Sequence, residues 1–402
     1  MDRNISILTL LLFITVTGFG QAIHQLGYYS VNGIMSVAAK SNFMILSNGR
    51  IVDNTIPSSP TLVSQYSFVG DGTSVIVNEN SAYFGTGMGN TLFIADISNI
   101  NFPLHKSSIP FNIGHGVFGM DISDNTLFVA LGVNGTVCSI DISDESNPDV
   151  LDTLYISGGQ CRDIVISDDF AFAAHENGLK VIDISNPSGM QLITSIGSGY
   201  NSIDISESLV FLGKSSGGID VYNILDPVNP TPAFSMANTG GTAWDLKYKD
   251  DHVYLATNSN GLFIYKIEDN TGIEMANFPN SGNGQSFGVC LQDSLVLLSG
   301  LINGVAILQY DSTWTVDINN MSSFDQINIY PNPATNYVHL ESSSAIDISQ
   351  IEIINLQGEV LKKQQYLNIR KAILDVKNIP KGIYVVRIYS RSNIYHSKLV
   401  IN

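Results

Sequence analysis

A repeat of roughly 40–45 residues runs through most of the chain and constrains its fold more than any other feature. A short apolar strand recurs seven times at spacings of 39 to 44, with the central residues Met44, Phe84, Phe128, Phe172, Phe211, Tyr254 and Leu297. A second marker recurs in phase with the first: Asp53, Asp96, Asp141, Asp183, Asn223, Lys266 and Gln309. Two markers with one period indicate seven copies of one structural unit.

Each unit contains the signals of an antiparallel hairpin between its two markers. Five units carry Asn-Gly there, and the other two carry Gly89-Asn90 and Gly217-Gly218. These residues tolerate positive φ, so we expect type I′ turns. One unit reads as four strands: 163–167, 170–174, 179–184 and 191–196. Four strands per unit is the size of a propeller blade.

The second strand of each unit is almost continuously apolar, as in 126–131. Such a strand is buried on both faces, as it is where blades stack face to face. We therefore predict an all-β chain with a seven-bladed β-propeller over residues 21–312. A β-solenoid is the rival architecture, but its repeats are usually shorter. The seventh unit offers only three strands, and we expect 25–31 to supply the fourth and close the ring.

The segment Leu179–Pro187, with the sequence LKVIDISNP, resembles the signature of LVIVD-repeat proteins, which are bacterial surface propellers. The segment 92–98 is a weaker copy, and later units drift from the pattern. The resemblance implies a propeller fold and an extracellular location, and it brings no catalytic residues to transfer.

The last part of the chain differs in composition. Residues 313–326 are polar and read as a linker. Residues 327–402 alternate like the strands of a small Ig-like β-sandwich. Their ordered pieces, among them Tyr330-Pro331-Asn332-Pro333 and 382–387, resemble the type A C-terminal sorting domain of type IX secretion. The resemblance implies that the type IX secretion machinery is a partner, through residues 327–402. An ordinary Ig-like module is the alternative.

The N-terminus and the charge balance indicate where the protein acts. Residues 1–20 combine Arg3, an apolar run and small residues before Gln21, which predicts a cleaved secretory signal peptide. We expect a secreted or outer-membrane-surface protein with no transmembrane segment. Residues 1–326 hold 10 Lys+Arg against 31 Asp+Glu, and such an acidic domain repels nucleic acid and anionic membranes.

Signatures of catalysis and of cofactor binding are not found in the sequence. The propeller has only Arg50 and Arg162, too few for a sialidase-like arginine cluster, and the seven histidines form no HxH or HxxxH pattern. We expect no catalytic residues, no metal and no cofactor. The repeated Asp is expected to shape turns. Cys138, Cys161 and Cys290 read as buried free thiols, with a Cys138–Cys161 disulfide as the alternative.

The segments that lead into the innermost strands differ in sequence from unit to unit. In a propeller these segments surround one mouth of the central channel. Here they carry aromatic and polar residues: His115, Gln160, Arg162, Asp163, Tyr200, Asn201, Trp244, Asp245, Gln285 and Phe287. Aromatic and polar groups together suit a glycan or a peptide. We predict ligand binding by Arg162, Tyr200, Asn201, Trp244 and Asp245.

The favoured function is a non-catalytic binding or scaffold propeller. The alternative functions are an extracellular hydrolase or lyase with its site at this mouth, for which Asp163 and Asp245 are the obvious acidic pair, and a purely structural surface-layer component.

Overall fold

The computed structural model describes residues 23–111, 116–132, 135–236, 240–279, 285–301, 304–311, 327–342, 348–355, 360–390 and 394–402. These residues form β-strands and no helix, which confirms the all-β class. The predicted signal peptide, the predicted linker and His115 lie outside them. One compact unit spans Ile23–Asp311, and the strands after Ile327 belong to a second unit. No described helix is both long and apolar enough to cross a membrane.

The first unit consists of seven four-stranded antiparallel sheets. Blades one to three contain β2 (Val37–Lys40), β3 (Phe43–Leu46), β4 (Arg50–Asp53), β5 (Thr61–Gln65), β6 (Gly72–Asn78), β7 (Ser81–Thr86), β8 (Thr91–Asp96), β9 (Leu104–Pro110), β10 (Val117–Ser123), β11 (Thr126–Leu131), β12 (Thr136–Asp141) and β13 (Asp149–Leu154).

Blades four to seven contain β14 (Cys161–Ser167), β15 (Phe170–His175), β16 (Gly178–Asp183), β17 (Gln191–Ile196), β18 (Tyr200–Ile205), β19 (Leu209–Lys214), β20 (Ile219–Asn223), β21 (Thr231–Met236), β22 (Ala243–Lys249), β23 (His252–Thr257), β24 (Gly261–Glu268), β25 (Thr271–Phe278), β26 (Ser286–Gln292), β27 (Leu295–Gly300), β28 (Gly304–Tyr310) and β1 (Ile23–Tyr29).

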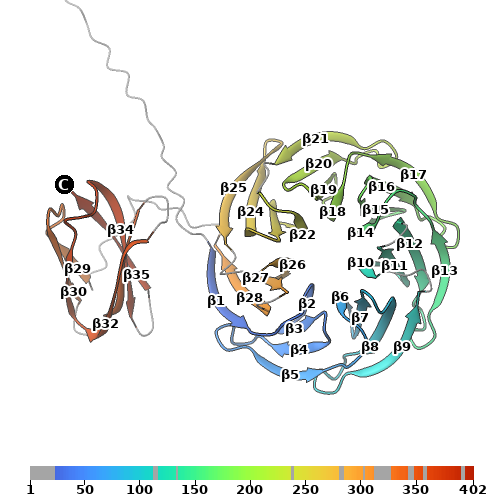
Figure 1. Ribbon diagram of the computed structural model, residues 1–402, viewed down its shortest axis with the longest axis horizontal. Coiled ribbons are helices and arrows are strands. Elements are labelled where there is room, and N and C mark those ends of the chain that lie inside the picture. The colour runs from blue at the N-terminus through green and yellow to red at the C-terminus, as the bar shows by residue number, and fades with distance from the viewer. Residues whose placement is uncertain are drawn as a thin grey trace, which may run out of the picture. The chain divides into compact units, whose positions relative to one another are not determined.

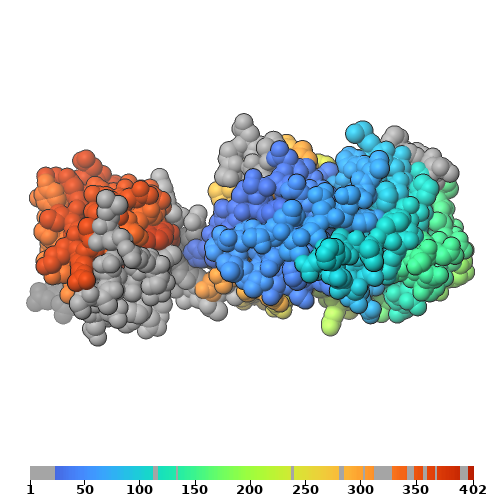
Figure 2. All heavy atoms as spheres, turned by 90° about the horizontal axis from the view of Figure 1, so that it is seen from below, coloured from blue at the N-terminus to red at the C-terminus, as the bar shows by residue number. Residues whose placement is uncertain are grey.

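The seven sheets stand around a central axis like the blades of a propeller (Figure 1). The first strand of each blade is innermost, and each of these inner strands contacts the inner strand of the next blade, including β26 with β2. The fourth strands form the rim. Seen from the side, the first blades follow one another along this rim without a break (Figure 2).

The ring is closed by the N-terminal strand. β1 pairs antiparallel with β28, from Ile23 opposite Tyr310 to Tyr29 opposite Val305. The seventh sheet therefore runs β1-β28-β27-β26 and joins the two ends of the repeat. The predicted closing segment is confirmed, with its strand beginning two residues earlier than expected.

The hydrophobic core lies between the blades. Tyr83 and Leu92 of the second blade pack with Val117 and Leu127 of the third, and similar buried clusters join the other described neighbours. Burial on both faces explains why the second strands are continuously apolar. Each buried aliphatic side chain contributes about 1.5–3 kcal/mol to folding.

The turns between the second and third strands differ in part from the prediction. Gly49, Gly178 and Gly261 have φ of +82°, +103° and +85°, but the asparagines before them do not have positive φ. The type I′ prediction is therefore wrong for these three turns, which need a left-handed residue only at glycine. Longer loops of this kind end in a left-handed glycine that forms a bulge.

The repeated aspartate shapes the turn that leads to the rim. Asp53, Asp96, Asp141 and Asp183 each accept a hydrogen bond at Oδ1 from the backbone N–H two residues later, at 2.8–2.9 Å. This geometry is an Asx turn, as predicted. These hydrogen bonds stabilise the charged form of each carboxyl and hold its pKa below the usual range.

The second unit contains two sheets. One is β29 (Ile327–Tyr330), β30 (Tyr337–Ser342) and β33 (Lys371–Asp375) in that order. The other has the order β32-β31-β34-β35, from Val360–Ile369, Ile348–Ile354, Gly382–Ser390 and Ile394–Ile401. Val338, Leu374, Val386 and Leu399 share one buried cluster with side chains from both sheets. An Ig-like topology stays a prediction.

Candidate ligand-binding site

A β-bulge near the start of the inner strand recurs in six of the seven blades. The pairing register shifts there by one residue, so that one residue of the inner strand has no partner on the second strand. The extra residues are Thr73, Phe118, Arg162, Asn201, Trp244 and Phe287. A bulge redirects its side chain out of the normal alternation of a strand. All six side chains line one cavity in the central channel.

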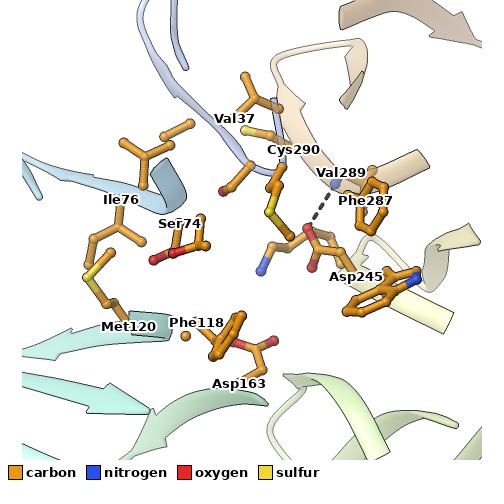
Figure 3. Close-up of a pocket in the computed structure, with 18 of the residues that line it drawn as sticks. Val37, Ser74, Ile76, Phe118, Met120, Asp163, Asp245, Phe287, Val289 and Cys290 are labelled. Carbon is orange, nitrogen blue, oxygen red and sulfur yellow. Dashed lines mark hydrogen bonds between the residues drawn. The ribbon is translucent and has the colours of Figure 1, made fainter. Parts of the chain in front are cut away.

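The cavity has a volume of ≈ 330 Å³. Its walls come from the inner strands of all seven blades, including Val37, Ile76 and Met120, with Asp163, Asp245 and Cys290 on the same surface (Figure 3). The fifth blade contributes Asn201 through β18. A space of this size is at the lower end of the range for small-molecule sites, about 300–1,000 Å³.

Four of the five predicted site residues line this cavity: Arg162, Asn201, Trp244 and Asp245. Tyr200 does not line it. The Tyr200 side chain is fully buried in the cluster between the fourth and fifth blades, with its hydroxyl 3.1 Å from Asp220 Oδ2 and 3.3 Å from the hydroxyl of Tyr222. Tyr200 directly precedes the bulge, so its side chain keeps the orientation of a paired strand residue and points between blades.

Arg162 is at the centre of an aromatic cluster. The carbon of its guanidinium is 5.2 Å from the centre of the Phe118 ring and 5.8 Å from that of Trp244. The rings of Trp244 and Phe287 are 5.1 Å apart and tilted by 50°. One nitrogen, Nη2, donates to Glu176 Oε1 at 2.9 Å. The Arg162 side chain is therefore held in place by cation–π contacts and one ion pair.

Aspartates on the inner strands connect successive blades. Asp163 accepts hydrogen bonds from the N–H of Ile164 on its own strand and of Ile203 on the next inner strand, at 2.9 and 3.2 Å. Asp245 accepts from Val289 N at 2.8 Å, drawn in Figure 3. Two further residues do the same: Asp121 with Ile166 N, and Asp204 with Tyr248 N, both at 2.7 Å. These carboxylates fasten inner strands together.

Burial changes how these carboxyl groups ionise. Burial raises the pKa of Asp163 to about 7, and the nearby charge of Asp245 adds to the rise, while Lys247 and the two backbone N–H groups oppose it. Burial also raises the pKa of Asp245 and of Asp121. Asp163 and Asp245, the acidic pair considered for catalysis, are therefore buried and hydrogen-bonded to backbone N–H groups.

Lys247 also lines the cavity, although it is not among the five predicted site residues. It lies on β22, two residues beyond Asp245. Burial disfavours its charged form, but the carboxylates of Asp245, Asp204 and Asp163 outweigh burial and raise its pKa. Its ammonium group is therefore charged at every physiological pH.

The three cysteines are free thiols, which leaves the alternative disulfide unformed. Cys138 and Cys161 are buried in different inter-blade clusters. Burial raises the pKa of Cys138 and of Cys290 to about 11. Among the described residues no group of three or more His, Cys, Asp and Glu side chains is arranged to hold a metal ion.

Comparison with known families confirms both resemblances found in the sequence. The LVIVD repeat model matches residues 69–109, 158–197 and 240–271, which fall in the second, fourth and sixth blades. The model described as the secretion system C-terminal sorting domain matches residues 328–402. The chain carries LVIVD repeats and a type IX sorting domain. No curated protein matches it in sequence.

Three solved structures are similar to this chain in fold at low sequence identity. The WD40 repeats of RRP9 share 10% identity at a TM-score of 0.56, covering 72% of this chain and 97% of that one. U3-55K shares 10% identity at a TM-score of 0.55, covering 71% and 98%. The designed protein Ika8 shares 14% identity at 0.52, covering 92% and 98%. At these identities the likeness shows the fold alone.

Proposed function

We propose that the protein is a non-catalytic binding or scaffold propeller that recognises a glycan or a peptide at the mouth of its channel. The sorting domain indicates that the protein acts outside the cell or on the outer-membrane surface. One observation supports the binding role: the repeated bulge presents five kinds of side chain from six blades to one cavity. A ring with only a structural role has no reason to vary its chemistry from blade to blade.

A binding role is favoured over the alternative of a hydrolase or lyase. General acid–base catalysis needs a carboxyl group within hydrogen-bonding reach of a substrate proton. Both oxygens of Asp163 already accept backbone N–H groups from two strands, and Asp245 accepts from the next blade. The pKa of Asp163 near 7 would suit a general base, but it is explained by burial in a structural role.

The proposal is tested with substitutions at the mouth. In glycan and peptide arrays followed by calorimetry, Trp244→Ala and Arg162→Ala are expected to weaken binding about tenfold, because a stacked aromatic pair contributes about 0.5–1.5 kcal/mol beyond area burial. The matched controls are Asp144→Ala and Asn186→Ala, whose side chains cap exposed turns leading to the rim. Weak binding by the turn variants with normal binding by the mouth variants would overturn the site. Turnover of a bound glycan would instead support the enzyme alternative.

A further inference from the structure

Four of the residues that line the cavity carry a hydrogen-bond donor without a partner among the described residues. The ammonium group of Lys247 makes no hydrogen bond or ion pair with any described residue. Arg162 Nε and Trp244 Nε1 are buried without a partner. The amide of Asn201 uses its oxygen, which accepts from Ser215 at 3.0 Å, and its nitrogen has no described acceptor. Arg162 Nε and Trp244 Nε1 are buried, and a buried donor without a partner lowers the stability of the fold.

Other polar groups of the same cavity already make hydrogen bonds within the protein, although a carboxylate can accept more than one. Asp163 and Asp245 bind backbone N–H groups, as described above. The hydroxyls of Thr73 and Ser74 both donate to the carbonyl of Val117, at 2.5 and 3.0 Å. A ligand that completes the cavity must therefore bring acceptors.

The charges around the cavity favour a ligand without net charge. The lining carries Arg162 and Lys247 against Asp163 and Asp245, and Glu176 and Asp204 lie just behind. An anion would meet no excess of positive charge, in a propeller that is strongly acidic overall. An organic cation would compete with the lysine that the chain itself places among three carboxylates. A neutral ligand faces neither penalty.

We propose that Lys247 anchors a neutral sugar residue inside the channel, donating hydrogen bonds to its hydroxyl or ring oxygens. This proposal rests on the proposed binding function and names its ligand class. Apolar walls from Phe118, Phe287 and Met120 suit the C–H faces of a pyranose, and the cavity volume suits one sugar unit rather than a length of polymer. Hydroxyl groups also donate, so the free lone pairs of Asp245 can complete the hydrogen bonding.

The test titrates the full-length exported protein with neutral mono- and disaccharides of glucose, galactose, mannose and xylose. Galacturonate and sialic acid serve as anionic probes, and glucosamine and arginine-ended peptides serve as cationic probes. A neutral sugar is expected to bind, and Lys247→Met is expected to weaken it at least tenfold. The matched control is Lys249→Met on the same strand, because Lys249 is exposed and lies outside the cavity; it should stay within twofold of the unmodified protein.

A second measurement needs no substitution, in case Lys247→Met does not fold. With lysines labelled with ¹³C at Cε, the Lys247 signal is expected to shift during titration with sugar while the Lys249 signal stays in place. Binding of charged probes alone, or sugar binding that leaves the Lys247 signal unchanged, would overturn this proposal and leave binding at the mouth intact. Binding of no probe of any class would count against both proposals.

Discussion

At the scale of single residues, the inner-strand position that follows the bulge has two different structural roles in different blades. The residue directly after the bulge is Asp163 in the fourth blade and Asp245 in the sixth, but Ser74 in the second and Gly119 in the third. Aspartate there fastens its blade to the next, while the smaller residues leave room for the neighbour: a Cβ on Gly119 would lie 2.5 Å from the Cα of Asp163. One inner-strand position therefore carries a hydrogen bond between blades in some blades and close packing in others.

The buried carboxyl of Asp163 makes stability depend on pH. Its pKa rises in the folded state to about 7 from an ordinary value of 3.8, so its contribution to stability is complete below pH 3.8 and is lost as pH rises through 7. One pKa unit corresponds to about 1.4 kcal/mol. The full loss is then of the order of 4 kcal/mol.

Asp163→Asn removes the titrating proton and is expected to flatten the fall in stability between pH 4 and pH 8. Urea unfolding at several pH values measures this free energy. The control is Asp168→Asn, on the exposed turn of the same hairpin, which should retain the slope of the unmodified protein. If the free energy of unfolding depended on pH in the same way for Asp163→Asn and the unmodified protein, ionisation of the Asp163 carboxyl would not cost stability.

At the scale of elements, the sequence predicts strands well and registers less well. The two in-phase markers and the hairpin signals locate four strands per unit and the closing strand. Phe128 is the third residue of the second strand in its blade. The third residues of the second strands in the second and first blades are Tyr83 and Ile45, each one residue away from the predicted markers Phe84 and Met44. A strand that is apolar on both faces offers no alternation to fix its register.

The site could be predicted only in part for a related reason. In the six blades with a bulge, the extra residue precedes the true marker by ten positions, as Phe118 precedes Phe128 and Arg162 precedes Phe172. Applied to the predicted markers, this spacing would have found Phe118 and rejected Tyr200, but it would have given Ser74 in place of Thr73, because the marker Phe84 is one residue out of register. Lys247 carries no such signal, because a lysine followed by Tyr248 and Lys249 looks like an exposed strand end.

The closing strand makes a contact that tolerates no added atom. A Cβ on Gly27 would lie 1.7 Å from the carbonyl oxygen of Pro57 in the first blade. Gly27→Ala is therefore expected to displace β1 and lower the free energy of unfolding by about 1–3 kcal/mol, the usual cost of overpacking. Thermal melting measures the loss.

Gly189→Ala is the matched control, since Gly189 is exposed and its added Cβ would meet only the amide of Asn186, at 3.1 Å. Deleting residues 23–31 should be more damaging than Gly27→Ala, because it leaves β28 as an unpaired edge. Equal melting temperatures for Gly27→Ala and Gly189→Ala would contradict a tight closure.

At the scale of the whole molecule, charge and fold divide the chain in the same place. Residues 1–326 carry a balance of −21 and residues 327–402 a balance of +4, which sum to the net −17. The seven sheets of the propeller lie within Ile23–Asp311, and none of the strands described after residue 326 belongs to them. The two units have separate hydrophobic clusters, and we therefore expect the ring to form without the sorting domain.

Deletion of residues 327–402 should separate export from folding. The shortened chain is expected to accumulate in the periplasm, because the part that matches the sorting domain is gone, yet to keep the circular dichroism and melting temperature of the propeller. Cell fractionation measures the first outcome. Conversely, a periplasmic reporter fused to residues 327–402 should reach the cell surface or the medium. Normal export of the shortened chain, together with periplasmic retention of the fused reporter, would show that the address lies within the propeller.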